Sequence, residues 1–148
     1  MHMRVSEVMA VDILCVPPGL SWKEAARLFL EARVSAAPVV DASGSLVGIL
    51  SEKDLFRGLF PRYVEWMAAP HAFHDFEAME RPDVADRDVS ELMARRLITA
   101  SPETPVLKVG ALMAASGIHH VPVVDGTKVI GMVNRGSIYR AILQKYFL

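Results

Sequence analysis

The sequence predicts a mixed fold of the α/β (α+β) class, built from two tandem copies of one unit of helices and strands. The first observation is an internal repeat, because residues 5–10 align with residues 89–94 without a gap. The motif at residues 38–41 also returns at residues 122–125, at the same offset of 84 (122 minus 38). The second observation is that both copies of this motif begin a strand, a turn and a strand that lead directly into a helix. A chain of 148 residues can form two small halves that share contacts, but not two independent domains of ordinary size.

The first unit begins with a short helical lead over residues 5–9 and an extended segment over residues 13–16. Ser21, followed three residues later by Glu24, forms a capping box that predicts a helix over residues 22–32. The apolar face of this helix is formed by Ala25, Leu28, Phe29 and Ala32. The unit is therefore expected to read helix, strand, helix, strand, strand, helix.

A strand pair is expected in each unit. In the first, the strands cover residues 38–41 and 46–50 around a tight turn, and a helix follows from Ser51 to about residue 60. In the second, the strands cover residues 122–125 and 129–133, with a turn that is one residue shorter. The last helix is expected from Ser137 to about residue 147.

The helix before the second strand pair has different end signals. Thr104 is the expected N-cap, Pro105 the first helical residue, and Gly117 the residue that ends the helix. Short helices are also expected over residues 62–67 and 73–80 in the segment between the units. The predicted boundaries are therefore 1–60 for the first unit, 61–88 for a helical connector and 89–148 for the second unit.

Composition excludes several classes of protein. No apolar run of about 18 residues is present, and the first residues lead into a polar stretch, so we expect a cytoplasmic protein without a membrane span. A net charge of −1, with mixed signs along the chain, gives no footprint for nucleic acid. The single cysteine, Cys15, rules out an internal disulfide. The apolar content of 52% favours a homodimer that covers an apolar patch.

The repeated motif resembles the CBS domain. The resemblance rests on PVVD at residues 38–41, the turn, and GILSEKD at residues 48–54, together with the second copy of this order. Two such units in tandem resemble a Bateman module. The sequence of residues 75–80 also resembles that of small stand-alone bacterial CBS domain proteins. The resemblance implies two βαββα units related by a pseudo-two-fold axis, a disc-like homodimer, and adenosine-containing ligands in clefts between the paired halves.

Asp54 is the candidate ligand-binding residue of the first repeat. A carboxylate can accept hydrogen bonds from both hydroxyls of a ribose, and such charge-assisted bonds contribute roughly 1.5–3 kcal/mol each. Ser51 would cap the helix and donate its hydroxyl, and Lys53 would add positive charge at the rim. The alternative is that Ser51 only caps the helix and Asp54 only supplies a favourable charge in its first turn.

The second repeat departs from this pattern. It has Asn134 and Arg135 at the helix start and Ser137 where the resemblance places the ribose-binding aspartate. A neutral hydroxyl cannot hold a diol as a carboxylate can. The second site is therefore expected to be weaker, altered in ligand preference or empty.

Two histidines precede the second PVVD motif. His119 matches a position where the sensor subunit of AMP-activated kinase, by the same resemblance, has a phosphate-contacting histidine, and Arg135 could join it. The alternative is that His119 and His120 have only a structural role at the start of a strand. The expectation is one site equipped for ribose and another equipped for phosphate.

Family analogy also assigns the adenine pocket. The backbone beside Ile13, Leu14 and Cys15, and its counterpart beside Ile98, Thr99 and Ala100, would line it. Further wall residues are expected next to the repeated motif: Ala36, Ala37, Pro38, Val121 and Pro122. For Cys15, a small packing residue is the favoured interpretation.

No catalytic constellation stands out. His71, His74 and Asp75 have a spacing compatible with two metal ligands on one helix face, but four-ligand closure is not visible, and a solvated connector is favoured. We therefore expect a non-enzymatic sensor with no metal and no cofactor. Its ligand would be AMP, ADP, ATP or S-adenosylmethionine, and it would act on an unidentified regulated protein. The alternative is a ligand-independent homodimerisation or protein-interaction module.

Overall fold

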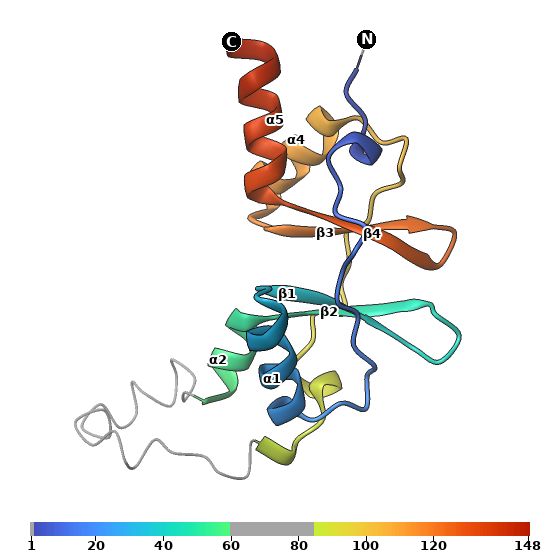
Figure 1. Ribbon diagram of the computed structural model, residues 1–148, viewed down its shortest axis with the longest axis vertical. Coiled ribbons are helices and arrows are strands. Elements are labelled where there is room, and N and C mark those ends of the chain that lie inside the picture. Colours follow the sequence, from blue (N-terminus) through green and yellow to red (C-terminus); the bar gives the residue numbers. More distant parts are fainter. Residues whose placement is uncertain (1, 60–84) are drawn as a thin grey trace, which may run out of the picture.

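The computed structural model describes residues 2–59 and 85–148 and has two units of α+β structure, as predicted. Each unit has one antiparallel pair of strands. Figure 1 shows the two sheets facing each other at the centre, with helices on their outer sides. The first unit contains η1 (Val5–Glu7), α1 (Trp22–Ala32), β1 (Ala36–Val40), β2 (Leu46–Ser51) and α2 (Glu52–Leu59). The second contains η5 (Val89–Glu91), α4 (Val106–Ser116), β3 (His120–Asp125), β4 (Lys128–Asn134) and α5 (Arg135–Phe147). The helices predicted over residues 62–67 and 73–80 lie outside the described residues.

Helix α1 has the predicted bounds, and the serine half of the predicted capping box forms. The Ser21 hydroxyl accepts a hydrogen bond of 3.2 Å from the Glu24 amide, which satisfies one of the free N–H groups of the first turn. Trp22, Ala25 and Phe29 are buried against the first sheet. Ala32, expected on the same face, is exposed because the helix ends there and the chain turns away.

The prediction that Thr104 caps α4 is wrong. The Thr104 hydroxyl instead accepts a hydrogen bond of 3.0 Å from the Ser101 amide, which closes the turn before the helix. Helix α4 begins after Pro105 without a side-chain cap, and the amide of Val106 donates to the carbonyl of Met3 at 2.8 Å. A backbone carbonyl from a distant segment therefore replaces the expected cap. Gly117 ends the helix, as predicted.

The two sheets have matching irregularities. Both hairpins shift register at equivalent points, between Val39 and Val40 in one and between Val123 and Val124 in the other. The extended segment expected over residues 13–16 adds only one parallel bridge, from Val16 to Val39. A third strand is therefore reduced to a single point of pairing.

The lead segments, defined as residues 4–10 and 88–94, are exchanged between the units. Val5, fully buried, lies in the core formed by Val109 and Met113 of the second unit. Val89, also fully buried, lies in the core of the first unit beside Phe29. Figure 1 shows the first lead beside α4 and the second beside α1. The predicted boundaries group each lead with the unit that follows it, whereas its packing joins it to the other unit.

Close backbone contact holds each lead in place. The amide and carbonyl of Ala10 exchange hydrogen bonds of 2.9 and 3.0 Å with those of Met132 on β4. A Cβ atom on Gly131 would lie 2.8 Å from the carbonyl oxygen of Ala10, which is closer than van der Waals contact allows. Gly48 is the equivalent residue on β2, and a Cβ atom there would lie 3.0 Å from the Ala94 carbonyl oxygen. The repeated glycine therefore makes room for the exchanged lead.

Within residues 2–59 and 85–148, no helix combines the length and apolar character needed to cross a bilayer.

Candidate functional site

Within the described residues, two clefts lie between the units, and each takes residues from both repeats. The larger cleft has a volume of about 480 Å³ and is lined by α2, by the segment that follows the second lead, and by the start of β3. The smaller cleft, of about 250 Å³, is lined by the segment that follows the first lead, the end of α1 and the end of β4. The repeat relates these linings, so the clefts are equivalent in position but not in chemistry.

Asp54 and Ser51 both line the larger cleft and form a closed pair at the start of α2. The Oδ2 atom of Asp54 accepts hydrogen bonds of 2.9 Å from the amide and from the hydroxyl of Ser51. The Ser51 hydroxyl in turn accepts a hydrogen bond of 3.2 Å from the Asp54 amide. Ser51 therefore caps α2, the role expected as the alternative to ligand binding. No described residue donates to the other carboxylate oxygen, Oδ1, so the carboxylate keeps accepting capacity after it has capped the helix.

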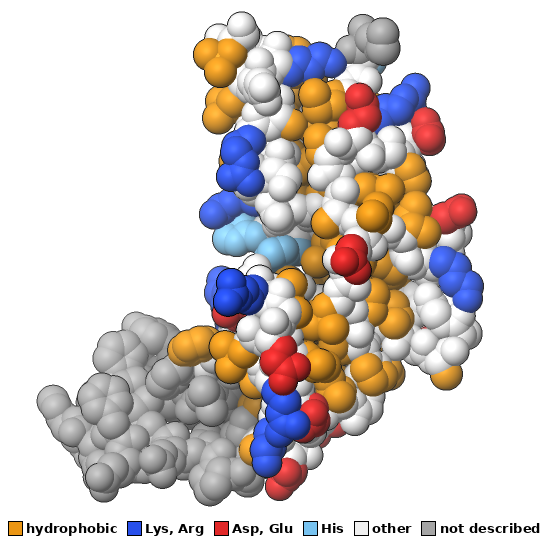
Figure 2. Space-filling view, viewed as in Figure 1, with side chains coloured by type: hydrophobic (Ala, Val, Ile, Leu, Met, Phe, Trp, Pro, Cys, Tyr) orange, Lys and Arg blue, Asp and Glu red, His pale blue; other side chains and the backbone are white. Residues whose placement is uncertain are grey.

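The lining of the larger cleft has a small excess of positive charge. Lys53, Arg57 and Arg96 line the larger cleft, against the two acidic residues Glu52 and Asp54. Figure 2 shows histidine side chains beside lysine and arginine side chains at the level where the two halves meet. A cleft with low-dielectric walls strengthens such a field, so the larger cleft favours anionic groups.

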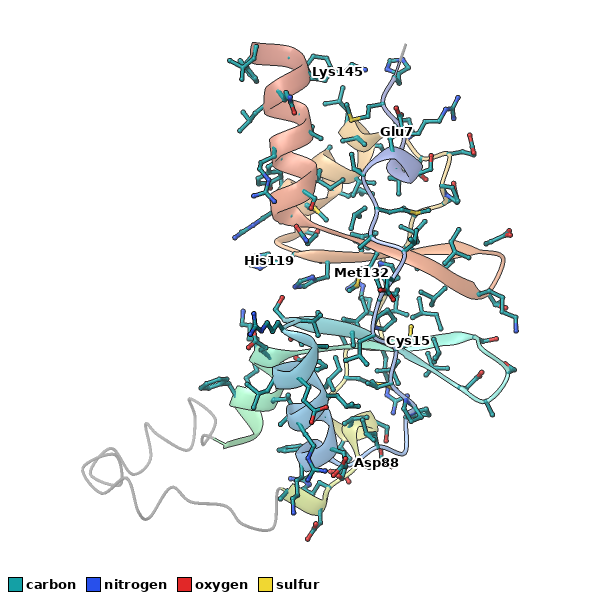
Figure 3. The ribbon with its side chains drawn as sticks, viewed as in Figure 1. Glu7, Cys15, Asp88, His119, Met132 and Lys145 are labelled. Atoms are coloured by element: carbon teal, nitrogen blue, oxygen red, sulfur yellow. The ribbon has the colours of Figure 1, made fainter. Side chains whose placement is uncertain are left out.

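His119 lies in the same cleft as Asp54, and Figure 3 shows it at the start of β3. Its Nε2 atom is 3.0 Å from Nη1 of Arg135, and its carbonyl accepts a hydrogen bond of 2.8 Å from the Arg135 amide. Because a guanidinium group can only donate, His119 accepts through Nε2. His119 and Arg135 are thus in contact, although Arg135 belongs to neither lining, and their joint binding of a phosphate stays a prediction. Asp54 and His119 line the same cleft, whereas the sequence predicted two separate sites for them.

His120 lines both clefts. Its Nδ1 atom is buried and has no hydrogen-bond partner among the described residues. Burial, and secondarily the neighbouring His119, lower the pKa of His120, and the carboxylate of Glu52 opposes this only in part. A ligand in either cleft could therefore form a hydrogen bond with this imidazole nitrogen.

The unliganded protein is expected to lose stability in acid through His120. Its pKa is lowered in the folded state from the usual 6.5, so the unfolded chain binds more protons between that value and the folded pKa. The contribution is complete above pH 6.5 and is lost as the pH falls through the folded pKa. Urea unfolding at a series of pH values should show this slope, and His120→Gln should reduce it. An unchanged slope in the variant would place the titrating group elsewhere.

The other predicted site residues are distributed as follows. Ile13 and Asn134 line the smaller cleft. Ala37, Pro38 and Pro122 are buried and belong to neither lining. Alternation along β1 turns Ala36 to the smaller cleft and Ala37 to the core of the first unit. Cys15 and Thr99 are exposed, Ser137 is half-buried, and none of the three belongs to either lining. Partial enclosure raises the pKa of the Cys15 thiol, and the Ser137 amide donates to Oδ1 of Asn134 at 2.8 Å.

Five charged lining residues were not predicted as site residues. Glu52, Arg57 and Arg96 belong to the larger cleft, and Asp12 and Arg33 to the smaller. One signal was available, because the offset of 84 places Asp12 on Arg96, an exchange of charge sign between aligned positions. Among residues 2–59 and 85–148, no group of three or more His, Cys, Asp and Glu side chains could hold a metal. His71, His74 and Asp75 lie outside that part of the chain.

The fold, the exchanged leads and the paired clefts define a tandem pair of small α+β units with clefts between them. The chain belongs to the CBS domain family, whose sequence pattern matches residues 5–60 and 89–144. It is 30% identical over 131 residues to an uncharacterized protein of Methanocaldococcus jannaschii, covering 79% of this chain and 78% of that one. It is also 28% identical to the homoserine O-acetyltransferase of Methanohalobium evestigatum over 95% of its own length, but it spans only 24% of that enzyme.

Solved structures of CBS pairs share this architecture. CBSX2 from Arabidopsis thaliana superposes with a TM-score of 0.75 and 25% identity, over 98% of this chain and 97% of that one. The CBS pair of protein MJ0100, solved with 5′-methylthioadenosine and S-adenosyl-L-methionine, gives a TM-score of 0.73 and 25% identity, over 98% and 99% of the two chains. CBSX2 has also been solved in complex with AMP, with a TM-score of 0.72 and 25% identity over 96% and 97%.

Proposed function

We propose that this chain is a non-enzymatic regulatory module whose larger cleft binds an adenine nucleotide or another adenosyl ligand. The candidates are AMP, ADP, ATP and S-adenosylmethionine. Binding would change how the module packs against a second copy or against a regulated protein. Membership of the CBS family supports this function, and so do the AMP and adenosyl ligands bound by CBSX2 and by the MJ0100 pair.

The observation that carries the proposal is the free accepting capacity of Asp54 within a basic cleft. Ser51 occupies Oδ2 and leaves Oδ1 for ribose hydroxyls. Lys53 and Arg96 line the same cavity and provide donors for phosphate oxygens. One cleft thus combines an acceptor for a diol with donors for an anion.

Asp54→Ala is expected to weaken binding of the preferred nucleotide roughly tenfold or more, the scale of one lost charge-assisted contact. Isothermal titration calorimetry against the four candidates measures this change. Asp54→Asn is the sharper variant, because its amide oxygen can still accept from Ser51 and preserve the cap while the charge is lost. Glu31→Gln, on the exposed side of α1, is the matched control. Absence of heat and of any melting shift with all four ligands at millimolar concentration would overturn the proposal.

A ligand-independent homodimerisation or interaction module is the second candidate, and the surface of α5 supports it. Leu143, Tyr146 and Phe147 of α5 are 54%, 49% and 75% exposed. Exposed apolar residues on one helix are typical of a docking surface. Sedimentation with and without nucleotide separates the candidates, because a dimer indifferent to every ligand supports this one.

A further inference from the structure

The smaller cleft differs from the larger one at the positions that the repeat makes equivalent. Asp12 of the smaller cleft aligns with Arg96 of the larger, at the offset of 84. Arg33 of the smaller cleft aligns in the same way with Gly117 of the larger. The smaller cleft therefore has an acidic side chain where the larger has a basic one. It has a basic side chain where the larger has a glycine. Their ligands should differ in charge accordingly.

Arg33 occupies a backbone conformation that is unfavourable for it. It ends α1 with φ +56°, in the left-handed region, while Gly117 ends α4 in the same region with φ +72°. Glycine is the usual residue at this position, because any residue with a Cβ atom is less stable there. A long cationic side chain is thus kept at the mouth of the smaller cleft at a cost in stability.

The charged groups of the smaller cleft are available to a ligand. No ion pair joins Asp12 or Arg33 to any described residue. Asn134 uses Oδ1 to accept from the Ser137 amide, so its side-chain NH₂ remains to donate. The rest of the wall includes the apolar side chains of Ile13, Val34 and Met132 together with the imidazole of His120. Figure 3 shows Met132 between the two sheets.

We propose that the smaller cleft binds a small zwitterion, an amino acid with an apolar side chain. Its ammonium group would pair with Asp12, its carboxylate with Arg33 and the Asn134 amide, and its side chain would contact the apolar wall. A volume of about 250 Å³, roughly half that of the larger cleft, suits such a ligand. This proposal does not depend on nucleotide binding at Asp54.

The test is an NMR titration of the ¹⁵N-labelled chain with L-leucine and two analogues that each lack one charge. These are 3-methylbutylamine, without the carboxylate, and 4-methylpentanoate, without the amine. Leucine is expected to bind roughly tenfold or more tightly than either analogue, because each loses one charge-assisted contact. Shifts should appear at residues 10–14 and 33–36. Absence of shifts, equal binding of an analogue, or shifts confined to residues 51–57 would overturn the proposal.

Variants separate binding from folding. Asp12→Asn and Arg33→Gln should each weaken leucine binding roughly tenfold. Arg33→Gly should weaken it as much while making the protein more stable, because glycine relieves the left-handed position. Glu31→Gln is the matched surface control, and Asp54→Asn should leave leucine binding unchanged even if it abolishes nucleotide binding. Full leucine affinity in Asp12→Asn or Arg33→Gly would overturn the assignment.

Discussion

Replacing Gly131 with alanine is expected to lower the free energy of unfolding by about 2–4 kcal/mol. The new Cβ atom would lie 2.8 Å from the carbonyl oxygen of Ala10, a backbone atom that cannot rotate away. Relief requires the first lead to move off β4, which breaks the paired hydrogen bonds between Ala10 and Met132. Urea unfolding followed by circular dichroism measures the loss.

Alanine substitutions at two other glycines serve as controls for Gly131→Ala. Gly19→Ala meets nothing within 4 Å, so it should leave the stability close to that of the natural sequence. Gly48→Ala should be destabilising but less so than Gly131→Ala. Its nearest neighbour is the flexible side chain of Met93, and the Ala94 carbonyl oxygen is 3.0 Å away. A Gly131→Ala protein as stable as Gly19→Ala would mean that the lead is not held tightly against β4.

Leu50→Ala is expected to cost about 2–5 kcal/mol, because it leaves a cavity in a fully buried site. Leu50 is 0% exposed and packs with Phe29 and the exchanged Val89 in the core of the first unit. Loosening this core should also release the second lead, which continues into the second unit. Both units should therefore unfold in one transition, with amide signals from β2 and β4 lost at the same urea concentration.

The matched control for this change is Leu30→Ala, because Leu30 is 78% exposed and should contribute less than about 0.5 kcal/mol. Separate transitions for β2 and β4 in Leu50→Ala would contradict the prediction. They would show that the exchanged leads do not couple the two cores.

Local signals account for the parts of the fold that the sequence predicted well. Helix α1 has a serine cap with a partner three residues away and an apolar face, and both act within one helix. Thr104 failed as a cap because a serine three residues earlier competes for its hydroxyl. The exchange of the leads was not predictable in this way, because Val5 and Val89 are apolar in either arrangement. The core that buries each valine is decided by contacts between residues far apart in the sequence. The Val5 amide, for example, donates to the carbonyl of Thr104, about 100 residues away.

The candidate site shows the same limit. Sequence reasoning found Asp54, Ser51 and Lys53, since a motif carries them together. It treated His119 as part of a separate site because it assigned one site to each repeat, whereas each cleft takes residues from both repeats. The unpredicted Arg96 comes from a segment that no motif marks. Its aligned partner Asp12 differs in charge, and comparison of the two repeats position by position would have exposed that difference.

The exchanged leads also bear on how a duplicated chain can change over time. Neither half has a complete core by itself, because Val5 belongs to the second core and Val89 to the first. Deletion of either half would leave the other unable to fold, so both must be inherited together even when only one performs a given task. Selection for folding therefore retains both copies, and the binding residues of either copy are free to diverge from those of the other. The pairs Asp54 and Ser137, and Asp12 and Arg96, are differences of this kind between aligned positions.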